Sequence, residues 1–140
     1  MTALPDDVRA LLDGPNYAHL ATLMSDGSPH VVAVWAGREG DHIVFYTGNP
    51  ASTKGRNIAR DSRVSISIVG HDDPYKRAHI RGRVVESRTE RALEAMDELS
   101  VKYTGEPFPF RGPGGVLYVV EADRVGFSHL PFVHRGTDAS

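Results

Sequence analysis

The feature that most constrains the fold is an alternation of basic and apolar residues within residues 76–85, which is strict from Arg77 to Val84. Side chains along a β-strand point alternately to its two faces. The segment therefore predicts a strand with one face in a core and the other strongly basic. The basic face carries Arg77, His79, Arg81 and Arg83.

Similar but shorter patterns predict further strands, joined mostly by tight turns. We expect these strands over residues 17–24, 30–35, 43–47, 64–69 and 116–120, the last one extending toward Phe127. Short helices are expected over residues 6–12 and 52–60, and from a capping box formed by Ser87 and Glu90 to Gly105. Five or six strands with a few helices indicate an antiparallel barrel rather than alternating strand–helix units. A chain of 140 residues that is 40% hydrophobic is expected to form one domain, residues 1–140, with one core.

The strand expected over residues 30–35 differs from the others because it is apolar on both faces. Such a strand needs cover on both sides, from the protein or from a ligand. One face is therefore available for an interface.

Several classes of function are excluded by what the sequence lacks. Without cysteine there are no disulfides, thiolate metal sites or cysteine nucleophiles. Seven histidines occur, but no pair has recognisable metal-ligand spacing, so we expect no metal. No apolar run approaches the roughly 20 residues that span a bilayer, and the start of the chain does not resemble a signal peptide, so we expect a cytoplasmic protein with no membrane partner. A net charge of −2 gives no general attraction to nucleic acid.

Residues 45–57 bring a strand end, hydroxyl groups and cations to the start of a predicted helix. Free backbone N–H groups and the positive end of the helix dipole favour an anion there. Thr47, Ser52 and Thr53 are able to donate hydrogen bonds to a phosphate, and Lys54 adds a full charge. The alternative is that Ser52 or Thr53 only caps the helix while Lys54 is solvated. The segment is not a P-loop, because Thr53 replaces the glycine that must precede the lysine.

The basic strand face has two readings as well. Its arginines are suited to a polyanionic ligand, but exposed basic residues are usually solvated or paired with acids. Arg77 is the functional candidate, because it follows Tyr75 at the strand entrance, where loops tend to line pockets. Aromatic residues that could flank a planar ring are Trp35, Tyr75, Phe108 and Phe110.

Four ordered segments together resemble a known family. They are Gly27-Ser-Pro-His-Val-Val32 followed by Trp35, Ile43-Val-Phe-Tyr-Thr47, residues 52–58 with Asp61-Ser-Arg-Val64, and Asp73-Pro-Tyr-Lys-Arg77 leading into Arg81-Gly82. The chain resembles the pyridoxamine-phosphate-oxidase-like split-barrel superfamily, in particular its branch of oxidoreductases dependent on the deazaflavin coenzyme F420.

This resemblance implies a mainly β protein with short helices, a split β-barrel of about six antiparallel strands. It also implies a homodimer with a cofactor at the subunit interface. Thr47, Ser52, Thr53, Lys54 and Asn57 would hold the cofactor phosphate, and Pro29, His30, Val31 and Val32 would run beside its ring. Tyr75 and Arg77 would close the pocket, from the other subunit.

The implied activity is transfer of a hydride from reduced F420 to an electron-poor unsaturated small molecule that accepts electrons. No residue is nominated as catalytic. FMN is the alternative cofactor, although residues 30–35 lack the arginines of the FMN-binding oxidases, which favours the deazaflavin. A non-catalytic carrier of a cofactor or tetrapyrrole is the second alternative.

Overall fold

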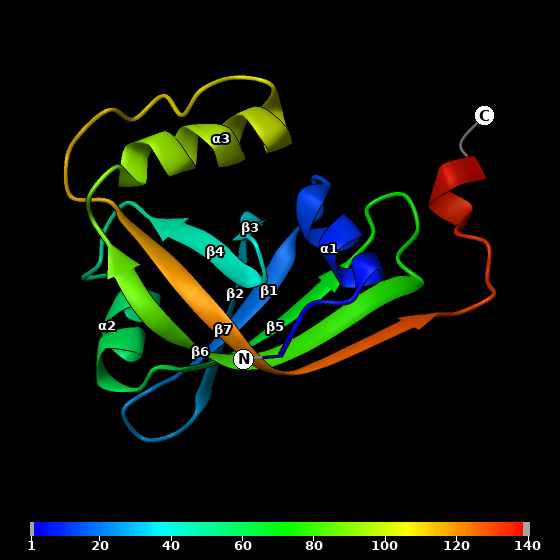
Figure 1. The fold of residues 1–140 in the computed structure, drawn as a ribbon, viewed down its shortest axis with the longest axis horizontal. Coiled ribbons are helices and arrows are strands. Elements are labelled where there is room, and N and C mark those ends of the chain that lie inside the picture. Colours follow the sequence, from blue (N-terminus) through cyan, green and yellow to red (C-terminus); the bar gives the residue numbers. More distant parts are fainter. Residues whose placement is uncertain (1, 139–140) are drawn as a thin grey trace.

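Seven antiparallel strands form one sheet in the computed structural model, which describes residues 2–138. The sheet has the order β2-β1-β5-β6-β7-β4-β3, and every neighbouring pair is antiparallel (Figure 1). The strands are β1 (Ala18–Leu23), β2 (Pro29–Val34), β3 (Ala36–Glu39), β4 (His42–Thr47), β5 (Arg63–Val69), β6 (Lys76–Arg88) and β7 (Val116–His129). The helices are α1 (Asp6–Asp13), α2 (Thr53–Arg60), α3 (Ala92–Thr104) and a 3-10 turn, η1 (Arg135–Asp138). The predicted fold class is confirmed, with seven strands in place of about six.

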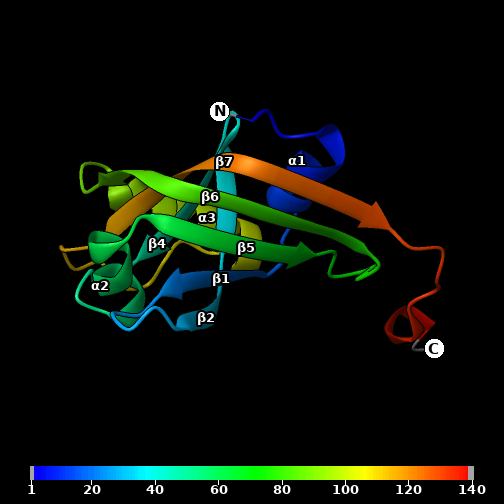
Figure 2. The same ribbon diagram turned by 90° about the horizontal axis from the view of Figure 1, so that it is seen from below.

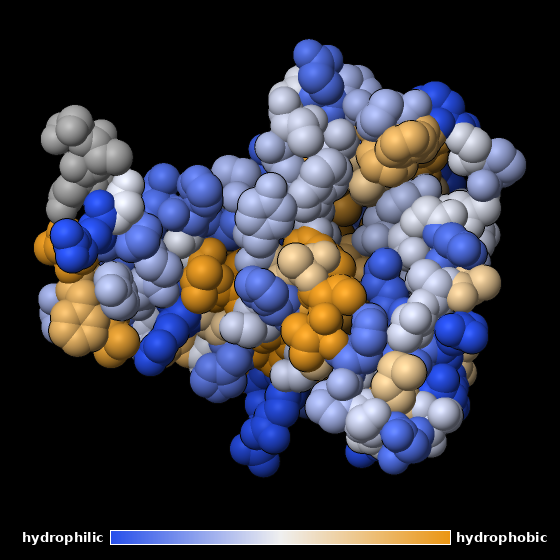
Figure 3. Space-filling model, turned by 180° about the vertical axis from the view of Figure 1, so that it is seen from behind, coloured by the Kyte–Doolittle hydropathy of each residue, from blue (hydrophilic) through white to orange (hydrophobic). Residues whose placement is uncertain are grey.

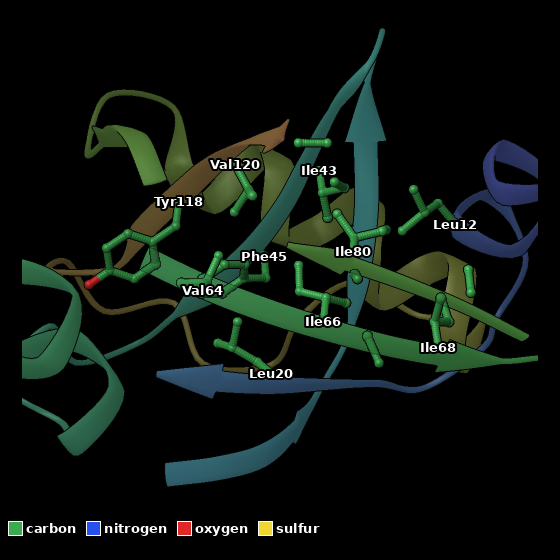
Figure 4. Packing of buried hydrophobic residues seen from close by; sticks show 14 of the residues in the cluster. Leu12, Leu20, Ile43, Phe45, Val64, Ile66, Ile68, Ile80, Tyr118 and Val120 are labelled. Carbon is green, nitrogen blue, oxygen red and sulfur yellow. The ribbon is translucent and has the colours of Figure 1, made fainter. Parts of the chain in front are cut away.

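The main core lies inside the curve of this sheet. Large side chains from β1, β4, β5 and β6 point toward one another there (Figure 4), among them Leu20, Phe45, Ile68 and Ile80, all 0% exposed. Helix α1 closes one end of the core with Val8, Leu11 and Leu12. The predicted alternation of β6 is confirmed, because Ala78, Ile80 and Gly82 are buried while the basic residues between them are exposed.

A second, smaller core lies outside the sheet, under α3. Val44 of β4 and Leu117 and Val119 of β7 pack there against Ala92 of α3. Strands β4 and β7 are therefore buried on both faces. Figure 1 shows α3 lying over these two strands, and Figure 2 shows β2, β1, β5, β6 and β7 side by side with α2 at one end.

Two local predictions were wrong. Ser87 does not cap a helix, because it belongs to β6 and lies opposite Tyr118 of β7. Helix α3 begins after Arg91, which adopts a left-handed conformation with φ 59° and provides no side-chain cap. Strand β3 was not predicted at all. The longer strand β6, which includes Ser87, and the additional strand β3 both result from pairing between distant segments, which the local pattern does not reveal.

The sheet does not close into a barrel, and this opening positions the site. Strands β2 and β3 are its two edges. Strand β3 pairs with β4 only as far as Phe45, so Tyr46 and Thr47 have no strand partner on that side. Because β2 continues into β3 through Trp35, the opening lies between β2 and the end of β4.

Candidate functional site

A cleft of about 300 Å³ lies at the opening of the sheet. Strand β2 contributes Ala33 and Val34, followed by Trp35, and β4 contributes Tyr46. Helix α3 and the loop after it supply the opposite wall. Among the residues that the structure describes, Lys54 is the one charged residue that lines the cleft.

Lys54 is half-buried and forms no ion pair or hydrogen bond with any residue in the described part of the chain. Burial lowers the pKa of Lys54, because the charged form loses hydration. The backbone N–H groups of Thr53 and Lys54, in the first turn of α2, also have no partner among residues 2–138. The Lys54 Nζ atom and these two N–H groups are therefore three donors at the start of one helix that have no acceptor among the described residues, and donors of this kind are able to bind an anion.

The turn before α2 is built by the hydroxyl groups that were predicted to bind phosphate. The Oγ1 atom of Thr47, a residue only 4% exposed, donates to the Asn49 carbonyl oxygen at 3.1 Å and lies 3.5 Å from the Ser52 Oγ atom. Ser52 caps α2 by accepting from the Gly55 N–H at 3.4 Å. Thr47 and Ser52 thus shape the turn that presents Thr53 and Lys54.

Asn57 lies away from the cleft. It is 1% exposed, and its Nδ2 atom donates to Thr22 Oγ1 of β1 at 3.0 Å. Its Oδ1 atom accepts from Arg60 Nη2 at 3.2 Å, while Arg60 also donates to the Leu23 carbonyl oxygen. These bonds attach α2 to β1, which is a structural role.

The predicted ring-binding residues of β2 divide between its two faces. Pro29 and Val31 point outward and are exposed, Val31 by 59%, whereas His30 and Val32 are half-buried. The Nδ1 atom of His30 is buried and has no hydrogen-bond partner among the described residues. Figure 3, seen from the side opposite to Figure 1, shows apolar side chains gathered near the middle of that side.

Tyr75 and Arg77 are not brought to the cleft within one chain. The Tyr75 ring lies 5.2 Å from the ring of Phe132, centre to centre. Arg77 Nε donates to Ser128 Oγ at 3.1 Å. Neither residue lines the cleft.

Trp35 and Phe108, which were considered as ring neighbours, do line the cleft, whereas Phe110 is 72% exposed. Tyr46, Met96 and Leu99 were not anticipated. Tyr46 follows a buried residue in an apolar strand, and the two α3 residues have the spacing of an ordinary amphipathic helix. Nothing in the local sequence distinguishes them from core residues.

Trp35 is held in place by a stacked neighbour. Its ring lies 5.3 Å from that of Tyr103 with 7° between the planes. The Tyr103 hydroxyl donates to the Asn16 carbonyl oxygen and accepts from the Ala36 N–H at 3.1 Å. Trp35 is the single tryptophan of the chain, so intrinsic tryptophan fluorescence reports on this cleft.

The sheet is open and antiparallel, and a cleft lined by one cation and several aromatic rings lies at its opening. This arrangement is typical of the split-barrel fold of an oxidoreductase superfamily. The chain belongs to the pyridoxamine 5'-phosphate oxidase family, whose model matches residues 4–129. The predicted family is therefore confirmed.

Solved structures agree with this assignment. A protein described as an F420 reductase is 29% identical, with a TM-score of 0.77, and the match covers 88% of this chain and 98% of that one. A conserved hypothetical protein from Mycobacterium tuberculosis is 22% identical, with a TM-score of 0.73 and coverage of 96% and 92%. A putative pyridoxamine 5'-phosphate oxidase from Listeria innocua is 18% identical, with a TM-score of 0.69 and coverage of 87% and 95%. The last two show similarity of fold alone.

No curated protein matches the chain. Within residues 2–138, no helix is long and apolar enough to cross a membrane. In the same range, no group of three or more histidine or acidic side chains is arranged to hold a metal ion.

Proposed function

We propose that the protein is a reductase dependent on coenzyme F420, with the cofactor phosphate at the N-terminus of α2 and the deazaflavin ring along β2. The observation that carries the proposal is Lys54, a half-buried cation at a helix start in an aromatic cleft, for which the described part of the chain provides no acidic partner. The similar F420 reductase supports it. We also propose, as the sequence predicts, that the protein forms one domain over residues 1–140 and that it is cytoplasmic.

The described residues offer suitable partners for the phosphate and for the ring of the cofactor. Lys54 Nζ, the Thr53 hydroxyl and the two free N–H groups would hold the phosphate. Trp35 and Val34, which line the cleft, would lie beside the ring. Thr47, Ser52 and Asn57 would act by holding the turn and the helix in position.

When bound in its reduced form, the deazaflavin supplies a hydride from its C5 atom, and the acceptor gains this hydride and one proton from solvent. The chain's contribution is to orient the ring and to exclude water from one of its faces. We therefore assign no catalytic acid or base.

A second copy of the chain completes the site in this proposal. Val31 and Ala33 of β2 are exposed and lie opposite Ala21 and His19 of β1, respectively. A homodimer would cover this mainly apolar face. It would also allow the partner's loops, including the segment that contains Tyr75 and Arg77, to approach the cleft.

The cations of the outer sheet face favour F420 over FMN. Arg81 and Arg124 lie directly opposite each other across β6 and β7, and neither forms an ion pair in the described part of the chain. Like charges placed in this way repel each other unless an anion lies between them. The acidic tail of F420 would supply such an anion, whereas FMN ends at its phosphate. FMN remains the second candidate, because the family match and the anion site suit it equally.

The test is a titration of the purified protein with F420 and, separately, with FMN, followed by Trp35 fluorescence. We expect F420 to bind more tightly than FMN. Lys54→Ala should weaken F420 binding by about tenfold or more, since hydrogen bonds to charged groups contribute about 1.5–3 kcal/mol. The matched control is Arg56→Ala, an exposed cation of the same helix that does not line the cleft. Binding of FMN alone would favour the flavoprotein, and binding of neither would contradict the proposed site.

A further inference from the structure

The wall of the cleft opposite β2 is apolar and uncharged. It consists of Met96 and Leu99 from α3 and of Phe108 from the following loop. If the cofactor ring lies along β2, as the proposed function requires, this wall is what an electron acceptor meets on the other side of the ring. It is therefore the part of the chain that would contact the acceptor in the proposed arrangement.

The loop between α3 and β7 is attached at its start by hydroxyl groups. Ser100 Oγ donates to the Glu106 carbonyl oxygen at 2.7 Å, and the Thr104 hydroxyl contacts the same oxygen at 3.2 Å. Figure 1 shows the loop returning along the length of α3 toward the start of β7. This path brings Phe108 back to the middle of the helix.

Asp97 of α3 fixes Phe108 at that point. Its Oδ1 atom accepts from the Phe108 N–H at 3.0 Å and from Arg111 Nη1 at 2.6 Å, and its Oδ2 atom accepts from Arg111 Nη2 at 3.2 Å. Arg111 Nη1 also donates to the Phe108 carbonyl oxygen at 3.0 Å. The Arg111 guanidinium lowers the pKa of Asp97, so the carboxylate stays charged at neutral pH. The backbone N–H and carbonyl groups of Phe108 are thus both bound by the Asp97–Arg111 ion pair.

The Phe108 ring stands at a steep angle to its aromatic neighbours. It makes an angle of 71° with the Tyr46 ring at 6.0 Å and of 67° with the Phe110 ring at 5.4 Å. Tyr46 and Phe108 line the cleft together, while Phe110 lies outside it. The two lining rings form an aromatic corner, which suits a flat molecule.

We propose that Phe108 determines acceptor specificity, that Asp97 is its positioning residue, and that the acceptor is a planar, uncharged, conjugated ring system. Lys54 is the single charged residue among the described residues that line the cleft, and the proposed function assigns it to the cofactor phosphate. An anionic acceptor would lose its hydration in this cleft without gaining a counter-charge. A neutral flat ring loses little hydration and gains contact with Phe108 and Tyr46.

The experiment uses the F420-loaded protein and three probes: menadione, its anionic relative 1,4-naphthoquinone-2-sulfonate, and the small non-aromatic acceptor cyclohexenone. Binding is measured by cofactor fluorescence and reduction by kcat/KM. We expect menadione to bind at least tenfold more tightly than the sulfonate. Phe108→Ala should lower kcat/KM for menadione about tenfold or more and change that for cyclohexenone less than threefold. Phe110→Ala, the matched control from the same loop, removes a neighbour of Phe108 but no cleft-lining ring, so it should change kcat/KM for either acceptor less than threefold.

Asp97→Ala should act through Phe108 and raise KM for menadione more than it lowers kcat. The double variant Phe108→Ala/Asp97→Ala should then be no worse than Phe108→Ala alone, a result that a merely structural role of Asp97 would not give. Equal effects of Phe108→Ala and Phe110→Ala, equal binding of both naphthoquinones, or binding of neither would overturn the proposal. Failure of the wild-type protein to bind F420 is a separate outcome, which would contradict the proposed function itself and this wall's role with it.

Discussion

Gly55 allows the turn that presents Lys54 to exist. A Cβ atom at this position would lie 2.1 Å from the Pro50 carbonyl oxygen, which is closer than atoms approach. The backbone of the turn therefore packs directly against the first turn of α2. The free N–H groups beside Lys54 depend on this close approach.

Gly55→Ala is expected to destabilise the protein by about 1–3 kcal/mol, the usual cost of inserting a methyl group into a packed site. It should also weaken F420 binding, because the turn must move. Gly48→Ala is the control, since a Cβ atom there meets nothing within 4 Å. Urea unfolding of both variants provides the measurement, and equal stability of the two would contradict this account of the turn.

At the residue scale, the sequence singles out Lys54 and Thr53 as phosphate-binding candidates, because hydroxyls and a cation at a helix start have a chemical meaning without any tertiary information. Their role in binding stays a prediction. Asn57 was assigned to the phosphate, but in the structure its amide group points to β1. Which face of a short helix is buried depends on its packing partner, and the local sequence does not specify that partner.

Lys102 connects three elements of the fold. Its Nζ atom donates to the carbonyl oxygens of Leu12, at 2.7 Å, and Ala36. It also lies 4.8 Å from the centre of the Tyr103 ring, which stacks on Trp35. Burial lowers the pKa of Lys102 to about 8, and the opposing influence of Asp13 is smaller.

We predict that Trp35 fluorescence changes with a midpoint near pH 8 as Lys102 loses its proton. Because the pKa is lower in the folded state than in the unfolded one, unfolding takes up a proton between about pH 8 and 10.5. The contribution of Lys102 to the free energy of unfolding therefore rises with pH in that window and is constant below it. Fluorescence titration of the wild-type protein and Lys102→Met from pH 6.5 to 9.5 provides the check. The same midpoint in both proteins would show that another group is responsible.

Strands with strict alternation, such as β5 and β6, were predicted closely because burial of one face imposes a period of two. Strand β3 was missed because its four residues include a glycine and two charged side chains, a pattern that does not indicate a strand. These residues form a strand because they pair with β4. The extra residues of β6 beyond Val85 pair with the start of β7 in the same way. Contacts between distant segments therefore account for most of what the local pattern did not predict.

At the scale of the whole molecule, the exposed apolar residues of β2 are where the proposed second copy would pack. Val31→Asp, on the exposed face of β2, is expected to convert the proposed dimer into a monomer, because a buried charge without a partner is costly. Val101→Asp on α3 is the control, since Val101 is similarly exposed, at 50%, but lies on another element. Analytical ultracentrifugation separates the outcomes. A monomeric wild-type protein would contradict the proposed dimer.

The central claim, that the start of α2 binds the phosphate of F420, is tested most directly by a thermodynamic cycle. Dissociation constants are measured for F420 and for the deazaflavin that ends at its ribityl hydroxyl, without phosphate or tail, on the wild-type protein and on Lys54→Ala. We predict that the wild-type protein prefers F420 by at least tenfold and that this preference falls severalfold or more in the variant. An equal preference in both proteins would contradict the claim.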